Sequence, residues 1–196
     1  MAIECRSSIE ADRILSGQGV TKGVLGFLML RLVLFRHGQA VPHDQGPDSQ
    51  RSLTATGQRE SGATAKALAE GGIVPDLVLV SSATRTRETW DNAKSYFSKT
   101  EMRLERDLYL ATPDVILSLL HALDPHPKTV MIVGHNPSLH DFALECYGFG
   151  DRYAFARLRD EFPTAACAVF DFDVPSWAEL SAHKGRLDRF LIPPPA

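Results

Sequence analysis

Short apolar runs alternate with longer segments of helical periodicity along most of this chain. The runs are rich in Val, Leu, Ile or Phe, which is typical of strands that are buried on both faces. We predict strands over residues 30–35, 77–80, 130–133 and 168–172. Because strands that alternate with helices build parallel sheets, the pattern predicts an α/β fold, a three-layer αβα sandwich with a mostly parallel central sheet.

Helices are predicted between these strands, and one further strand near the end of the chain. The predicted helices lie at 53–69, 85–97, 113–123 and from 137 to a glycine cap at Gly148. Thr112 is placed to cap the third of them, with Pro113 at its first position. The last apolar segment, 187–192, is predicted to be an edge strand, because the prolines that follow it cannot continue a strand ladder.

The beginning of the chain differs from the rest. Residues 1–28 are polar, punctuated by glycine and without a sustained period. We expect 1–28 to be a disordered extension, or the product of an upstream start codon with Met29 as the functional start. The remainder, 29–196, has a length that suits one domain.

Composition and charge exclude several classes of protein. Lys and Arg total 21 against 24 Asp and Glu, so the net charge of −3 indicates neither a nucleic-acid partner nor a membrane partner. Arg31 and Arg36 interrupt the longest apolar stretch, which is therefore too short to span a bilayer. Acidic residues stand where a secretory signal needs positive charge, so we expect a cytoplasmic protein. Cys5, Cys146 and Cys167 form no disulfide or zinc pattern.

Basic side chains follow three of the predicted strands at the point where each strand ends. Arg36 and His37 follow the first strand, Arg85 the second and His135 the third. The carboxyl ends of parallel strands lie along one edge of a sheet, where ligands bind. We therefore expect these four side chains to converge. Two guanidinium groups and two imidazoles in one crevice favour an anion, and the planar fork of arginine suits the oxygens of a phosphoryl group.

Histidine in such a crevice can also act as a nucleophile toward phosphorus, which gives a phosphohistidine intermediate that water later hydrolyses. His37 is the better nucleophile, because Gly38 follows it and allows close approach of the ligand to the backbone. Arg36, Arg85 and His135 would then stabilise the equatorial oxygens of the phosphoryl group. Such a site requires no metal and no other cofactor.

These residues belong to motifs that occur in a fixed order along the chain. The motifs are Arg36-His37-Gly38, Leu53-Thr54-x-x-Gly57, Ser81-Ser82-x-x-Arg85-Thr86-x-x-Thr89, Gly134-His135-Asn136-Pro137 and Phe162-Pro163-Thr164. Their order and spacing resemble the histidine phosphatase superfamily, also called phosphoglycerate-mutase-like. The short length and the second and last motifs look most like its SixA-type phosphohistidine phosphatase branch. The resemblance covers about residues 29–193.

The resemblance implies a role for each matching residue. His37 would be the phosphorylated nucleophile, Arg36 and Arg85 would clamp the phosphoryl oxygens, and His135 would complete the pocket. The implied substrate is a phosphorylated protein or a small phosphorylated molecule. We further expect Gln39, Arg51 and Asn136 to contact the substrate, although an ion pair between Arg51 and Asp48 that anchors the loop is an equal alternative for Arg51.

The proton donor is the open point of this interpretation. Asn136 stands where the acid-phosphatase branch has an aspartate that donates the proton. Asp107 and Glu105 are the nearest candidates by order along the chain, while Asp44 and Asp48 lie in the loop after the first motif. An alcohol leaving group gains about 10² to 10⁴-fold from a placed acid.

A phosphohistidine substrate can instead leave as a neutral imidazole that is protonated from solvent. The missing acid therefore favours phosphohistidine in a protein over phosphate esters. Two alternatives remain at this point: a small-molecule phosphomonoesterase that uses Asp107 or Glu105 as its acid, and a catalytically weak regulatory module that binds phosphorylated ligands.

Overall fold

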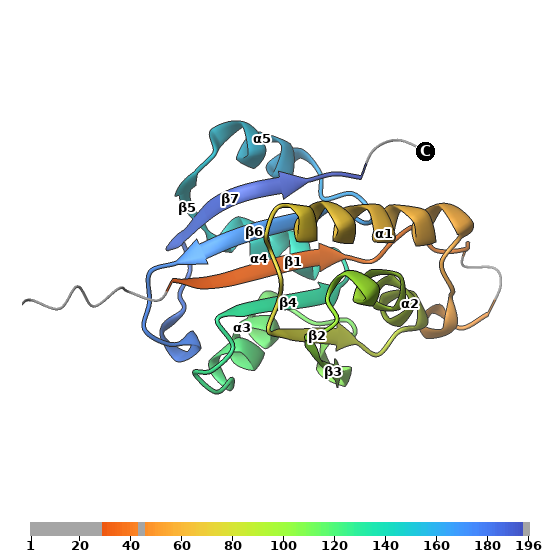
Figure 1. The fold of residues 1–196 in the computed structure, drawn as a ribbon, viewed down its shortest axis with the longest axis horizontal. Helices are drawn as coiled ribbons and strands as arrows, with labels where there is room; N and C mark the ends of the chain where they lie inside the picture. Colours follow the sequence, from red (N-terminus) through yellow and green to blue (C-terminus); the bar gives the residue numbers. More distant parts are fainter. Residues whose placement is uncertain (1–28, 43–45, 194–196) are drawn as a thin grey trace, which may run out of the picture.

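The computed structural model describes residues 29–42 and 46–193. In this part of the chain seven strands form one sheet of order β3-β2-β4-β1-β6-β7-β5 (Figure 1). The strands are β1 (Leu30–Arg36), β2 (Leu77–Ser81), β3 (Glu101–Glu105), β4 (Thr129–Gly134), β5 (Tyr147–Gly150), β6 (Cys167–Phe172) and β7 (Gly185–Leu191). The predicted disordered segment, 1–28, lies outside the described residues.

The sheet is mostly parallel, as predicted. β1 pairs in parallel with β4, β4 with β2, and β2 with β3. β6 runs antiparallel to both β1 and β7, and β5 pairs in parallel with β7. The four strands predicted from apolar runs are confirmed as β1, β2, β4 and β6.

Two strands escaped the sequence analysis, and one expectation was wrong. β3 has the sequence Glu-Met-Arg-Leu-Glu and β5 has Tyr-Gly-Phe-Gly, and neither is an apolar run. The segment predicted as an edge strand is β7, but it lies inside the sheet, because β5 pairs with its outer side. The edges are β3 and β5, which are short and largely exposed, as edge strands commonly are.

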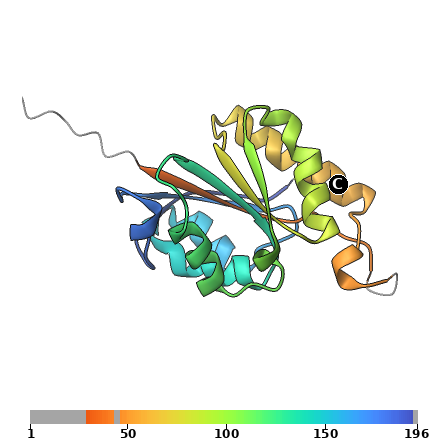
Figure 2. The same ribbon diagram turned by 90° about the horizontal axis from the view of Figure 1, so that it is seen from below.

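Five helices cover the two faces of the sheet, which confirms the three-layer sandwich within the described residues (Figure 2). They are α1 (Ala55–Glu70), α2 (Thr84–Ala93), α3 (Pro113–His121), α4 (Ser138–Cys146) and α5 (Arg152–Asp160). α1 and α2 pack on one face, against side chains such as Val33 and Phe35 of β1. α3, α4 and α5 pack on the other, against Leu32 and Leu34. Alternate residues of β1 therefore enter two separate cores.

Several helix ends differ from the expectation. α2 gives way to a 3-10 turn at Lys94–Tyr96. α4 stops at Cys146, because Tyr147 begins β5, so Gly148 lies in a strand and caps no helix. Thr112 is the residue that caps α3, but its side chain makes no capping hydrogen bond.

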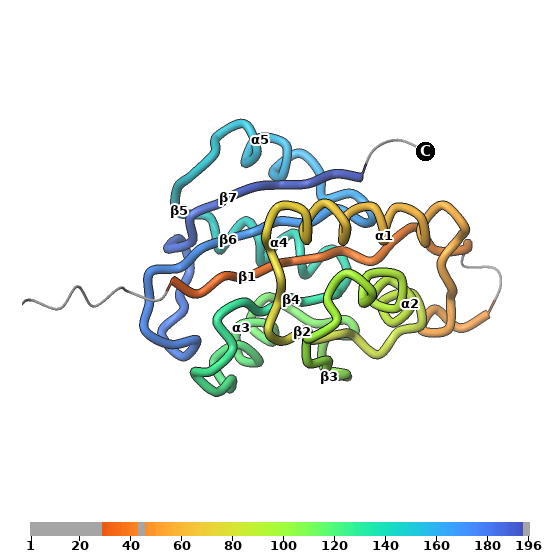
Figure 3. Tube along the Cα trace, viewed as in Figure 1, coloured from red at the N-terminus to blue at the C-terminus, as the bar shows by residue number. Residues whose placement is uncertain are grey.

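The arrangement places three loops together. The trace in Figure 3 shows β1, β4 and β2 side by side, with their carboxyl ends at the same edge of the sheet. The loops that leave these ends carry the predicted site residues. No helix in the described part of the chain is long and apolar enough to cross a membrane.

Candidate active site

A cavity of about 540 Å³ opens at the carboxyl edge of the sheet. It brings together the four side chains predicted to converge, with others from the loop after β1 and from two further loops. Its lining residues are Arg36, His37, Gln39, Ala40, Asp48, Arg51, Arg85, Leu110, His135, Asn136 and Thr164. The expectation that strand-end residues meet at one place thus agrees with the geometry.

His37 is held firmly at the end of β1. Its backbone N–H donates to the Gly134 carbonyl (3.1 Å), and its carbonyl accepts from the N–H of Ala165 (3.0 Å). The ring Nδ1 lies 2.7 Å from the carbonyl oxygen of Gly38. A carbonyl can only accept, so Nδ1 carries the proton and the neutral ring keeps its lone pair on Nε2. That atom accepts a hydrogen bond from Arg85 Nε (3.2 Å).

Gly38 gives this turn its shape. A Cβ atom at this position would lie 2.5 Å from the carbonyl oxygen of Gly57 and 2.6 Å from Ser61 Oγ, closer than real contacts allow. The Gly38 N–H donates to Thr89 Oγ1 (3.0 Å), which ties the loop after β1 to α2. A glycine is therefore needed for the loop to pack against α1.

His135 faces His37 across the cavity, with ring centroids 5.2 Å apart. Its Nε2 lies 2.8 Å from Ser81 Oγ, while its buried Nδ1 has no hydrogen-bond partner. If the serine hydroxyl donates to Nε2, the ring proton lies on Nδ1, which can donate to a ligand. The ring of Tyr109 lies nearly perpendicular to the ring of His135, with centroids 5.8 Å apart.

Both imidazoles are neutral at pH 7. Burial is the main cause that lowers the pKa of His37 to about 4. The hydrogen bond to Gly38 opposes this shift, and the nearby charges of Arg85 and Arg36 add to it. Burial likewise lowers the pKa of His135 to about 3. A neutral His37 has the free lone pair that a nucleophile needs.

Arg36 and Asn136 are anchored by one backbone carbonyl. Arg36 Nη1 donates to the carbonyl of Phe162 (2.6 Å), and so does Asn136 Nδ2 (2.9 Å). Arg36 Nε and Asn136 Oδ1 are buried without a hydrogen-bond partner. A buried N–H donor without a partner is costly unless a ligand satisfies it. Arg36 Nε is thus suited to bind an anion.

Asp48 links two arginines at the mouth of the cavity. Its carboxylate accepts from Arg51 Nη1 (3.0 Å), Arg85 Nη2 (3.0 Å) and Tyr109 Oη (2.9 Å). Burial opposes ionisation of Asp48, but the hydrogen bonds from Arg51 and Tyr109 and the charge of Arg85 outweigh it and hold its pKa well below its usual range. Burial and the hydrogen bond to Asp48 raise the pKa of Tyr109. Asp48 is therefore a carboxylate at neutral pH.

The remaining predicted residues divide between the cavity and other places. Arg51 lines the cavity and also pairs with Asp48, so both interpretations of it describe its position. Gln39 lines the cavity as well, while its carbonyl accepts from the N–H of Thr54. The structure does not bring Glu105 or Asp107 into the lining of the cavity: Glu105 ends β3, and Asp107 is exposed beside a neighbouring groove.

Sequence reasoning missed Tyr109, which contacts both His135 and Asp48. No motif marks it, since its place depends on where the segment after β3 meets the loop after β1. Ser81 belongs to a motif that was noted, but its contact with His135 was not foreseen.

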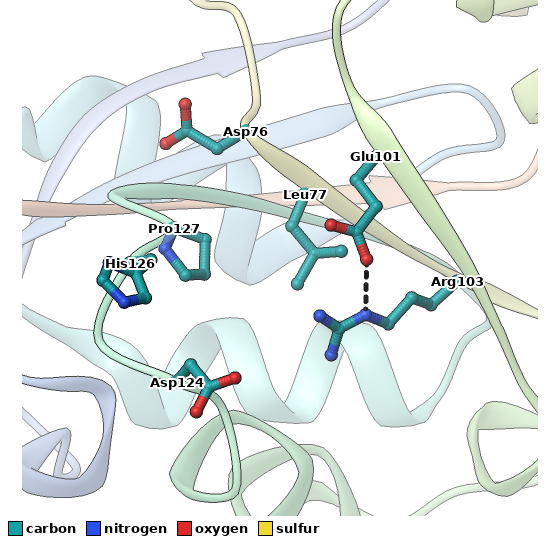
Figure 4. A pocket seen from close by; sticks show the side chains of 7 residues that line it. All are labelled: Asp76, Leu77, Glu101, Arg103, Asp124, His126 and Pro127. Atoms are coloured by element: carbon teal, nitrogen blue, oxygen red, sulfur yellow. Dashed lines mark hydrogen bonds and ion pairs between the residues drawn. The ribbon is translucent and has the colours of Figure 1, made fainter.

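A second cavity, of about 350 Å³, lies at the opposite edge of the sheet, where β2, β3 and β4 begin (Figure 4). Two of its acidic groups have partners: Asp76 accepts from the backbone N–H groups of Lys128 and Thr129, and Glu101 pairs with Arg103. Among residues 29–42 and 46–193, no cluster of three or more His, Cys, Asp or Glu is placed to hold a metal ion.

Comparison with known proteins agrees with this geometry. The sequence model of the histidine phosphatase superfamily (branch 1) matches residues 32–109. A candidate phosphohistidine phosphatase SixA of Agrobacterium tumefaciens is 30% identical, with a TM-score of 0.71 over 84% of this chain and 98% of that one. A second candidate SixA, of Nakamurella multipartitia, is 27% identical, with a TM-score of 0.72 over 84% and 96%.

An uncharacterized protein of Mycobacterium leprae is also 29% identical over 151 residues, which are 76% of this chain and 91% of that protein. The family model and the solved structures thus indicate the same superfamily, and this chain covers nearly the whole length of the SixA structures. The chain belongs to the histidine phosphatase superfamily, in its SixA-type branch, and is a histidine-type phosphatase.

Proposed function

We propose that this phosphatase removes the phosphoryl group from phosphohistidine in a protein, without a metal, and that His37 carries the phosphoryl group in between. The choice of phosphohistidine as the substrate rests on the ionised state of Asp48. It is the one carboxylic side chain among the described residues that line the cavity, and two arginines and a tyrosine keep it ionised. An ionised carboxylate has no proton to give to a leaving alcohol.

The charges of the cavity suit a dianion. Three guanidinium groups and one carboxylate line it, which leaves two positive charges while both histidines are neutral. A phosphoryl dianion would balance them. Arginine forks bind phosphoryl oxygens in pairs, and they stabilise the charge that spreads over these oxygens during transfer. The guanidinium groups can therefore do the work that a metal does in other phosphatases.

In the first step, His37 Nε2 attacks phosphorus. A new N–P bond forms at His37 while the N–P bond of the substrate breaks, and its electron pair stays on the imidazole of the substrate, which takes a proton from solvent. The hydrogen bond from Nδ1 to the Gly38 carbonyl fixes the tautomer and the direction of attack. The Nε group of Arg85, which occupies Nε2 in the free protein, turns to the phosphoryl oxygens.

In the second step, water attacks the phosphorus of phospho-His37. The N–P bond breaks, its electron pair returns to Nε2, and the proton of the water leaves with the phosphate product or to solvent. His135 Nδ1, which has no partner in the free protein, would bind a phosphoryl oxygen throughout both steps. The two candidate SixA relatives are described as phosphohistidine phosphatases, which supports the same substrate for this chain.

Phosphate release in EDTA tests this proposal. The substrates are a protein that carries phosphohistidine and a generic aryl phosphate, and the proteins are wild type, His37→Ala and the control His126→Ala. His126 is exposed and lines the second cavity at the opposite edge of the sheet.

We expect wild type and His126→Ala to hydrolyse phosphohistidine faster than the ester, and His37→Ala to lose both activities. Faster hydrolysis of the ester would contradict the substrate and favour a small-molecule phosphomonoesterase. Loss of activity in EDTA that added metal restores would contradict the metal-free chemistry.

A further inference from the structure

A groove of about 540 Å³ lies directly beside the catalytic cavity. Its apolar lining comes from Leu110 and Ala111 and from Val115 and Leu119 of α3, and we call it the α3 groove. Ser118, Arg106 and Asp107 add polar groups. Leu110 also lines the catalytic cavity, so the two hollows share a wall and an occupant of one can continue into the other.

Leu110 is unusual in two independent ways. Its side chain is 78% exposed, the second most exposed of the large hydrophobic side chains in the described residues. Its backbone has a φ of 57°, in the left-handed region, which is strained for an L-residue other than glycine. Strained backbone clusters at functional sites, and Leu110 joins the apolar lining of the α3 groove rather than standing alone on the surface.

We propose that the α3 groove binds the apolar side chains that flank the phosphohistidine of a protein substrate, while the phosphoimidazole itself enters the catalytic cavity. This rests on the proposed function above. It assigns the groove a role in recognition and assigns Leu110 to the contact between the two sites.

The chemistry of the groove favours a protein segment over a free phosphorylated metabolite. A free phosphohistidine carries an amino and a carboxylate group beside the imidazole, and neither gains from an apolar lining. The charged pair at the rim, Arg106 and Asp107, is of opposite sign, so the groove offers no net charge to an ionic ligand. Neighbouring residues of a polypeptide can supply apolar side chains next to the phosphoimidazole, and an apolar centre with a polar rim is the usual form of a protein contact.

The test compares hydrolysis of phosphohistidine in a protein with hydrolysis of the free phosphorylated amino acid. Ser118→Trp places a bulky side chain in the groove from an exposed position on α3, and Ser95→Trp is the matched control at an exposed position after α2. The substrates are a protein that carries phosphohistidine and the free phosphorylated amino acid. We expect Ser118→Trp to lower kcat/KM for the protein about tenfold, mainly through KM, and to change turnover of the free amino acid less than twofold. Ser95→Trp should change neither.

A second variant separates recognition from stability. Leu110→Gly relieves the left-handed strain, so its Tm should be no lower than that of the wild type, while kcat/KM for the protein substrate falls. Equal effects of Ser118→Trp on both substrates, or no effect on either, would overturn the proposed role of the groove and leave the proposed function intact. A wild type that hydrolyses esters but neither form of phosphohistidine would overturn the proposed function, and the role of the groove with it.

Discussion

Replacing Asp48 by asparagine would remove one negative charge from the catalytic cavity with little change in the size of the side chain. The carboxylate lies 3.0 Å from Arg85 Nη2, and the Nε of that guanidinium lies 3.2 Å from His37 Nε2, the atom that we propose as the nucleophile. Asp48 would therefore lie close to a phosphoryl group bound at His37 and would repel it. It also holds Arg85 in place through a bond between charged groups.

Two opposite effects follow from this geometry. At about 6 Å and an effective dielectric constant of about 20, two unit charges interact by about 3 kcal/mol. The Asp48 side chain is 31% exposed, so solvent screens part of this repulsion. We expect Asp48→Asn to bind inorganic phosphate about tenfold more tightly, which corresponds to about 1.4 kcal/mol. The variant should also lose about 1–2 kcal/mol of unfolding free energy. Arg51 and Arg85 donate to different oxygens of Asp48, and asparagine offers only one acceptor oxygen, so one of these hydrogen bonds is lost and the other becomes neutral.

Isothermal titration with inorganic phosphate and chemical denaturation measure the two effects. Asp107→Asn is the matched control, since it removes the same charge at an exposed position outside the catalytic cavity, and it should change phosphate affinity less than twofold. Phosphate affinity of Asp48→Asn equal to or weaker than that of the wild type would refute the reasoning. A loss of about 10² in the hydrolysis of an alkyl phosphate, with phosphohistidine hydrolysis intact, would instead identify Asp48 as a proton donor.

Three other predictions follow from the site. Gly38→Ala should lose about 1–3 kcal/mol of unfolding free energy, seen as a lower Tm, because its Cβ would meet the backbone of α1; an unchanged Tm would contradict this. Tyr109→Phe keeps the aromatic ring beside His135 but loses the hydrogen bond to Asp48, so kcat/KM for phosphohistidine should fall severalfold at most. A loss of activity as large as that of His37→Ala would contradict the supporting role of Tyr109. Burial lowers the folded-state pKa values of His37 and His135 to about 4 and about 3, below the unfolded value, so the unfolded state binds more protons and the free energy of unfolding falls as pH drops below about 6.5. The slope is up to about 1.4 kcal/mol per pH unit for each histidine. Denaturation at pH 7.5 and at pH 5 should show this loss of unfolding free energy, and the loss should be smaller in the double variant His37→Gln/His135→Gln.

The central strands of the sheet and the main residues of the cavity could both be predicted from the same apolar runs in the sequence. Each apolar run is a strand buried on both faces, and His37, Arg85 and His135 follow three such runs. Parallel strands bring their carboxyl ends to one edge, so the order of strands did not need to be known. β3 was missed because its alternating charged residues, at an exposed edge, give no apolar run.

The supporting contacts could not be predicted because they join segments that are distant in the sequence. Tyr109 and Asp48 are separated by 61 positions, and their hydrogen bond depends on how two irregular loops meet. Glu105 and Asp107 were natural candidates for a proton donor by order along the chain. The residue of this segment that contacts His135 and Asp48 is instead Tyr109. Order along the chain carries no information on which side of a turn faces the cavity.

The central claim is that His37 carries the phosphoryl group, and rapid-quench trapping of the phosphorylated enzyme tests it most directly. The protein is mixed with a substrate labelled with radioactive phosphate in EDTA, quenched in alkali within milliseconds, and digested for mapping. We predict label on the peptide that contains His37, stable in alkali and lost in acid as a phosphoramidate is, and no label in His37→Ala. Label on another residue, or steady turnover by His37→Ala, would contradict the account.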